Sequence, residues 1–173
     1  MKKNADRAAR ATKLEELVKN RSITIEHPVI VAPDQEEKLP TSNKSDGPRI
    51  RFVTEKTNET CLSVLSKSIG ALVFGSATRP GGGWRNGAVA QEEDVSLSST
   101  WGLQAEKAPE GFYKTEKGWG LDNCLAAKGF YLFDAYGHEL DVPRPCLFIS
   151  IAAPNQKIPD IKKKPKRKTD WSA

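Results

Sequence analysis

The sequence predicts a single α/β domain. Residues 50–53 have the composition of a strand, residues 58–68 predict a helix capped by Asn58, and residues 71–75 predict a buried strand. This strand, helix, strand order is typical of an α/β sheet, and three glycines at 81–83 follow at the carboxyl end of the second strand, where such sheets bind ligands. The length of 173 residues, with 38% hydrophobic and 28% charged residues, suits one globular domain.

Periodicity and composition predict the other elements. Apolar residues at helical spacing indicate an amphipathic helix over residues 5–20. Residues 34–48 are polar with two prolines and are expected to form a loop, whereas residues 105–124, rich in Gly, Lys and Glu, are expected to be irregular. A turn-rich connection is predicted between residues 133 and 146. Three further segments are strand-like: 29–32, 130–133 and 146–151.

A glycine loop and a carboxylate pair lie close together between residues 76 and 94. The glycines are Gly81, Gly82 and Gly83, and the polar group that follows them is Gln91, Glu92 and Glu93. Glycines carry no Cβ, so their backbone N–H groups can approach a ligand closely and adopt positive φ, which suits a diphosphate. Residues 87–90 are interpreted as the opening of a helix whose N-terminus would attract an anion. Anion and carboxylic acid would then be neighbours.

The two glutamates cannot act as a facing pair. Consecutive residues on a helix point about 100° apart, so at most one of Glu92 and Glu93 catalyses and the other orients. A helix N-terminus lowers the pKa of a nearby carboxyl group, whereas a bound diphosphate in a water-poor cleft raises it. The second effect is the one that proton donation near neutral pH requires. Asp94, which follows the pair, is expected on the helix surface.

Residues 80–93, with the sequence PGGGWRNGAVAQEE, resemble the signature of the bacterial or microbial-type poly(ADP-ribose) glycohydrolases. This macrodomain family cleaves ribose–ribose bonds in ADP-ribose polymers. The resemblance implies a macrodomain-like three-layer α/β/α sandwich that binds ADP-ribose, or an ADP-ribosylated protein or polymer, without a cofactor or a metal. Weaker similarity extends over residues 5–156.

The resemblance also implies a role for each residue of the site. Glu93 would donate a proton to the leaving ribose oxygen and then help to activate the attacking water. Glu92 would hold ribose hydroxyls, Gln91 would orient the pair, and the three glycines would cradle the diphosphate. Asn86 and Asn155 are further substrate-binding candidates, and Trp84 either covers a ribose or base or serves as a packing anchor.

Two departures from the family pattern leave alternatives open. Val73 stands where the family usually has an asparagine, and the chain ends without the family's second glycine-rich phosphate loop. The sequence is therefore compatible with a glycohydrolase, with a module that binds ADP-ribose without cleaving it, or with an incomplete domain that needs further chain or a partner. The C-terminal part of the family fold is expected to be missing.

Composition suggests how the chain is organised and where it acts. We expect an N-terminal helical extension and linker at 1–48, a core at 49–156 and a basic tail at 157–173. The dense basic run Lys162–Lys168 is compatible with a solvated tail, a nuclear import signal or contact with nucleic acid. Three cysteines without metal-ligand spacing predict reduced core thiols, and no apolar secretory or membrane segment is evident, so a cytoplasmic or nuclear location is expected.

Overall fold

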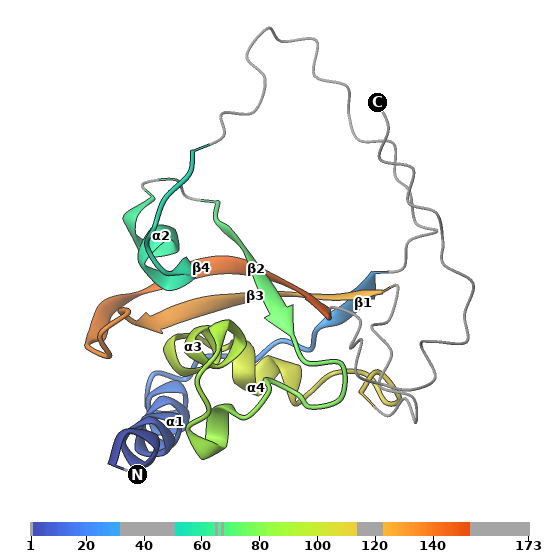
Figure 1. Cartoon of the computed structure of the whole chain (residues 1–173), viewed down its shortest axis with the longest axis horizontal. Coiled ribbons are helices and arrows are strands. Elements are labelled where there is room, and N and C mark those ends of the chain that lie inside the picture. The colour runs from blue at the N-terminus through green and yellow to red at the C-terminus, as the bar shows by residue number, and fades with distance from the viewer. Residues whose placement is uncertain (1, 32–50, 65, 67, 114–122, 153–173) are drawn as a thin grey trace, which may run out of the picture.

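The fold is built on a four-stranded mixed sheet with the strand order β1-β3-β4-β2 (Figure 1). Its edge strand β2 (Gly70–Gly75) pairs parallel to β4 (Glu139–Ala152), whereas β3 (Cys124–Phe133) pairs antiparallel to both β4 and β1 (Val29–Val31). The computed structural model describes residues 2–31, 51–64, 66, 68–113 and 123–152. The predicted α/β class is confirmed.

The described helices lie on one side of the sheet or beside its edge. Figure 1 shows α3 (Gln91–Ser98), α4 (Trp101–Ala105) and the long α1 (Lys2–Asn20) stacked on one side. A short helix, α2 (Thr57–Ser63), contacts both β2 and α3, and the 3-10 helix η1 (Trp84–Asn86) precedes α3. Within the described ranges, no helix covers the opposite face of the sheet. None of these helices is long and apolar enough to cross a membrane.

The main core lies between α3, α4 and the sheet face that they cover. Alternate residues of the strands are buried there, as the period of a strand requires. Gly129 on β3 allows the close approach of α4, because a Cβ at this position would lie 2.3 Å from the Thr100 hydroxyl oxygen. The core consists of Cys61, Ala71, Val73, Val95, Trp101, Ala105, Leu125, Ala127, Tyr131, Cys146 and Phe148. Val73, where the resemblance implied an asparagine, is thus a core residue.

Four local predictions were wrong. Residues 51–53 form no strand, and α2 ends at Ser63, where the next residue turns extended. Asn58 does not cap α2, since Lys56 takes that position and the Asn58 side chain donates inward to the Ser98 hydroxyl at 3.0 Å. The connection after β3 is a short turn, and β4 runs through two prolines of the predicted connection.

The helix that carries the carboxylates begins later than predicted. Residues 87–90 are not helical, because Gly87 adopts φ 75° and ends η1, and Ala90 is extended. The helix α3 therefore begins at Gln91, which places Glu92 and Glu93 in its first turn.

Several predicted features lie outside the described residues. They are the loop at 34–48, the central part of the irregular segment at 105–124, Asn155, and the tail at 157–173 with its basic run. The division of the chain at residues 48 and 156 and its location in the cell stay predictions.

Asp94 of α3 forms ion pairs that link three helices, and it is not the surface carboxylate that we expected. Its side chain is 19% exposed and pairs with Arg7 of α1 at 2.7 Å and with Lys56, next to α2, at 3.2 Å. Arg7 also donates through Nε to the carbonyl of Ala88 at 3.1 Å. Burial alone would raise the pKa of Asp94, but the hydrogen bonds and charges of Arg7 and Lys56 outweigh it and lower this pKa.

We predict that Asp94→Asn lowers the free energy of unfolding by about 1 to 3 kcal/mol at pH 7, because it leaves the half-buried Arg7 without its counter-charge. The lowered pKa means that the ion pair stabilises the fold above about pH 4 and loses its effect as the pH falls, so the difference should vanish in acid. Urea titrations at pH 7 and pH 3 measure both effects. The matched control is Glu139→Gln, which removes the more exposed Arg21–Glu139 pair and should cost less than about 1 kcal/mol; equal losses at pH 7 would contradict the prediction.

Candidate active site

The candidate site lies where β2 ends and the chain enters the glycine loop. Glu92 and Glu93 are only 4% and 8% exposed, although both are acidic. One oxygen of each carboxylate accepts a backbone hydrogen bond: the Ser76 N–H donates to Glu92 Oε2 at 2.7 Å, and the Gly83 N–H donates to Glu93 Oε1 at 2.8 Å. The loop is therefore fastened at both ends to the carboxylate pair.

The second oxygen of each carboxylate lacks a hydrogen bond within the described part of the chain. Glu92 Oε1 and Glu93 Oε2 are buried and have no hydrogen-bond partner among the described residues. A buried polar atom without a partner costs free energy, so native structures retain such atoms chiefly where function requires them. The pair can thus offer two oxygens to the hydroxyl or ether oxygens of a ligand.

Glu92 has the electrostatics of a group that exchanges protons near neutral pH. Burial raises its pKa from 4.5 to about 7; the Ser76 N–H opposes the rise, and the charge of Glu93 adds to it. Trp101, fully buried beneath the pair, weakly favours the ionised form of Glu92. A carboxyl group with a pKa near 7 can hold a proton at physiological pH and release it during a reaction.

The glycines let the loop pass directly against the carboxylates. Gly81 and Gly82 both have φ +64°, a conformation that other residues rarely adopt. A Cβ on Gly82 would lie 2.3 Å from Glu93 Oε1 and 3.0 Å from Glu92 Oε2. The carboxylates themselves therefore require Gly82, a constraint that the sequence did not reveal. At Gly81 and Gly83 a Cβ would instead lie 2.7 Å from Trp84 and from Ala88, respectively. The contact of the three glycines with a diphosphate stays a prediction.

Gln91 holds the carboxylate helix against the edge of the sheet. Its side-chain Oε1 accepts the Phe74 N–H at 2.9 Å, and its Nε2 donates to the Leu72 carbonyl at 2.8 Å and to the Thr57 hydroxyl at 3.2 Å. The amide thus pairs with β2 as a neighbouring strand would. Gln91 thus fixes the start of α3 to β2, and its role in orienting the pair stays a prediction.

Trp84 and Asn86 occupy different environments. Trp84 is 1% exposed, packs with Ala11 and Leu97, and donates through Nε1 to Glu106 at 3.2 Å, which supports the packing-anchor alternative. Asn86 is exposed at the end of η1, where its backbone N–H donates to the Gly83 carbonyl at 3.0 Å. A ligand role for either side chain stays a prediction.

Sequence reasoning missed two residues beside the pair. Ser76 supplies a backbone donor, and its position directly after a buried strand was the available signal. Tyr113 lies near Glu92, and burial together with that negative charge raises the pKa of its hydroxyl; no sequence signal connects these two residues. In the part of the chain that the structure describes, no group of three or more His, Cys, Asp or Glu residues could hold a metal ion.

The fold is thus that of an α/β domain. Its polar site, which consists of the glycine loop and two buried carboxylates, lies at the end of β2. The sequence model of the family described as "Microbial-type PARG, catalytic domain" matches residues 2–125. The chain therefore belongs to the microbial-type poly(ADP-ribose) glycohydrolase (PARG) family. A search among curated proteins gives no match.

Solved structures of bacterial PARGs share the fold. PARG from Thermomonospora curvata matches with a TM-score of 0.69 and 22% identity, over 92% of this chain and 68% of that chain. A second structure from this organism, bound to the inhibitor ADP-HPD, matches with a TM-score of 0.64 and 22% identity, over 87% of this chain and 63% of that chain. PARG from Deinococcus radiodurans in complex with ADP-ribose matches with a TM-score of 0.49 and 28% identity, over 57% of this chain and 42% of that chain.

The two Thermomonospora curvata matches confirm the predicted macrodomain-like α/β fold over part of its length. This chain spans about two thirds of the Thermomonospora curvata structures. The described residues supply the sheet, the helical layer on one face and the loop that holds the carboxylate pair.

The close contact between Gly82 and the carboxylate pair predicts that an added methyl group lowers stability more at Gly82 than at Gly111. Both Gly82→Ala and Gly111→Ala introduce a side chain at positive φ, which costs about 1 to 2 kcal/mol. A Cβ at Gly111 meets nothing within 4 Å, whereas one at Gly82 overlaps Glu93, so Gly82→Ala should cost about 1 to 3 kcal/mol more. Urea denaturation of both variants compares them. Equal losses in the free energy of unfolding of the two variants would show that Gly82 is not in close contact with the carboxylates.

The raised pKa of Glu92 predicts that Glu92→Gln stabilises the fold at neutral and alkaline pH. Because the folded pKa of about 7 lies above the ordinary glutamate pKa of 4.5, Glu92 favours folding in acid and loses this effect as the pH rises through 7. The gain of the variant over the natural chain should grow between pH 4.5 and 7 and reach at most about 3 kcal/mol. Free energies of unfolding from pH 4 to pH 8.5 measure it, with the exposed Glu16→Gln as control. A difference that does not depend on pH would contradict the prediction.

Proposed function

We propose that this chain carries the catalytic site of a glycoside hydrolase that cleaves O-glycosidic ribose–ribose bonds of poly(ADP-ribose). The observation that carries the proposal is the pair Glu92 and Glu93, buried beneath the glycine loop with one unpartnered oxygen each, in a chain of the microbial-type PARG family. Such a pair combines a proton donor with an acceptor for ribose hydroxyls in a site sheltered from water.

In the proposed reaction, Glu93 acts as general acid and then as general base. Its unpartnered Oε2 donates a proton to the leaving ribose oxygen as the bond to the anomeric carbon breaks and positive charge develops there. The carboxylate that results accepts a proton from the attacking water, which restores the acid. The Gly83 N–H, bound to Oε1, holds the carboxyl group in place throughout.

Glu92 and the loop prepare the site for this step. Glu92 accepts a hydrogen bond from a ribose hydroxyl through its unpartnered Oε1. Because its pKa is about 7, Glu92 can be protonated near neutral pH, which reduces the negative charge next to Glu93. Residues Gly81, Gly82 and Gly83 lie against the diphosphate, whose negative charge favours protonation of nearby carboxyl groups. Gln91 keeps the carboxylate helix in register with β2.

A second candidate is a module that binds ADP-ribose and turns it over slowly or not at all. The observation that favours it is the partial span of the family fold, about two thirds of the Thermomonospora curvata structures. A displacement of the scissile bond by about 1 Å can cost about two orders of magnitude in rate. A ligand held from one side only is also more exposed to water, which weakens electrostatic stabilisation.

We predict that Glu93→Gln keeps ADP-ribose binding but lowers the single-turnover rate on ADP-ribose polymer by a factor of about 10² to 10⁴, because the amide keeps the shape and loses the acidic proton. Calorimetry measures the binding, and release of ADP-ribose with protein in excess measures the chemistry. Glu16→Gln is the matched control on an exposed helix surface and should match the natural chain.

The outcomes separate the two candidates. Turnover by the natural chain that Glu93→Gln removes supports the hydrolase, whereas binding of ADP-ribose without turnover supports the module. ADP-ribose should also raise the melting temperature more than AMP does, since AMP lacks the distal ribose that meets the pair. Equal shifts for both ligands would contradict both candidates.

A further inference from the structure

Trp101 is a buried aromatic residue of the main core whose one polar atom lacks a partner. It is the first residue of α4, and its side chain is fully buried. Its ring packs against Phe148 of β4, with 6.1 Å between the ring centroids, so packing fixes the orientation of the indole. Its Nε1–H nevertheless completes no hydrogen bond with any described residue. A buried indole N–H usually has an acceptor, so one is expected close by.

The acceptor that is left is the buried oxygen of Glu92. Of the two carboxylate oxygens, Oε2 accepts the Ser76 N–H at 2.7 Å, whereas Oε1 has no hydrogen-bond partner among the described residues. Trp101 acts on Glu92 as a hydrogen-bond donor and thereby lowers the pKa of Glu92. An indole N–H without an acceptor and a carboxylate oxygen without a donor are therefore neighbours.

A second polar group lies near the same oxygen. A Cβ on Gly75 would be 3.6 Å from Glu92 Oε1 and 2.2 Å from the Ser150 hydroxyl oxygen, so both atoms border the space that a side chain would fill. Ser150 lies on β4 and is buried. A hydroxyl donates or accepts as its surroundings require, so Ser150 can adapt to either protonation state of Glu92. An indole N–H can only donate, and it favours the ionised carboxylate.

The remaining groups that act on the charge of Glu92 come from its own helix and from the segment after α4. Burial and the charge of Glu93 raise the pKa of Glu92, and the Tyr113 hydroxyl has its own pKa raised by burial and by the charge of Glu92. Against these, the Ser76 N–H and Trp101 favour the ionised form. Of these two donors, only Trp101 is a side chain that a substitution can remove.

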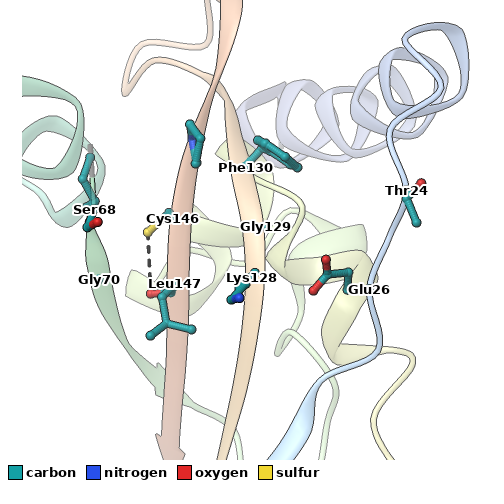
Figure 2. A pocket seen from close by; sticks show the side chains of 11 residues that line it. Thr24, Glu26, Ser68, Gly70, Lys128, Gly129, Phe130, Cys146 and Leu147 are labelled. Carbon is teal, nitrogen blue, oxygen red and sulfur yellow. Dashed lines mark hydrogen bonds between the residues drawn. The ribbon is translucent and has the colours of Figure 1, made fainter. Parts of the chain in front are cut away.

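The cavity on the other side of the sheet does not account for the unpartnered N–H. Figure 2 shows this cavity, of about 600 Å³, over β3 and β4. Thr24 and Glu26 lie along one side of it and Ser68 along the other, with Lys128 between them. Trp101 does not line the cavity, so a molecule bound there would leave the indole N–H without an acceptor.

We propose that Trp101 is a positioning residue for Glu92, whose ionised carboxylate accepts the Trp101 Nε1–H through Oε1 and is held by it in one orientation. A carboxylate oxygen has two lone pairs, so Oε1 can accept the indole N–H and a ribose hydroxyl together. Trp101 thereby opposes the effect of burial on the proton of Glu92. The proposal concerns the free protein and does not depend on the proposed reaction.

The test follows the proton of Glu92 in the 173-residue chain by NMR. Carboxyl carbon signals of isotope-labelled glutamate are titrated, and the signal that Glu92→Gln removes belongs to Glu92. Trp101→Phe should raise the midpoint of this signal by about one pH unit, because the ionised form loses a hydrogen bond. Trp84→Phe is the matched control. It also removes a buried indole N–H, which donates to Glu106 at 3.2 Å, and should leave the midpoint unchanged.

The indole signals of the natural chain provide a second readout, which does not require Trp101→Phe to fold. The Nε1–H resonance of Trp101 should shift with the midpoint of Glu92 and should lose this dependence in Glu92→Gln, whereas the Trp84 resonance should not follow Glu92. The proposal is overturned if the Trp101 resonance does not titrate with Glu92, or if Trp101→Phe and Trp84→Phe change the midpoint equally. It is also overturned if Ser150→Ala raises the midpoint and Trp101→Phe does not.

Discussion

Two buried carboxylates that accept backbone hydrogen bonds from the segment after β2 determine the layout of the molecule. Adjacent negative charges taken out of water are costly, and here each is offset by one N–H donor, from Ser76 or from Gly83. To supply both donors, the chain must leave β2, turn twice through positive φ and return against the first turn of α3. The triple glycine, the late start of α3 and the burial of Trp84 beneath the loop follow from this path.

The rest of the helical layer keeps this arrangement in place. Gln91 fixes the start of α3 to β2, and Asp94, in the same first turn, ties it to Arg7 of α1 and to Lys56. Arg7 also binds the Ala88 carbonyl, so one guanidinium spans the end of the glycine loop and the carboxylate helix. The N-terminal helix is therefore part of the support of the site, although its residues lie more than 80 positions away in sequence.

Local patterns revealed the chemistry of this chain better than its contacts. The glycines and the pair Glu92 and Glu93 could be recognised because their spacing is short, and β2 because its apolar run is continuous. The helix start could not be predicted, since Gly87 adopts the left-handed conformation and donates its N–H to the Trp84 carbonyl, which ends η1 and separates it from α3. The surface position predicted for Asp94 was wrong, because its partner Arg7 is 87 residues away in sequence and no periodic pattern indicates such a contact. The segment that carries the carboxylate pair could be recognised from the sequence, but the distances within it could not.

The edge strand β2 connects the two supports of the carboxylate pair. The residue that follows the strand, Ser76, donates its backbone N–H to Glu92. The backbone groups of Leu72 and Phe74 bind the Gln91 side chain, which sets the start of α3. Because β2 is paired to β4 along its whole length, the sheet fixes both the loop donor and the helix that carries the acids. The distance between Ser76 and Glu92 is therefore set by the position of one strand and not by the local sequence of the loop.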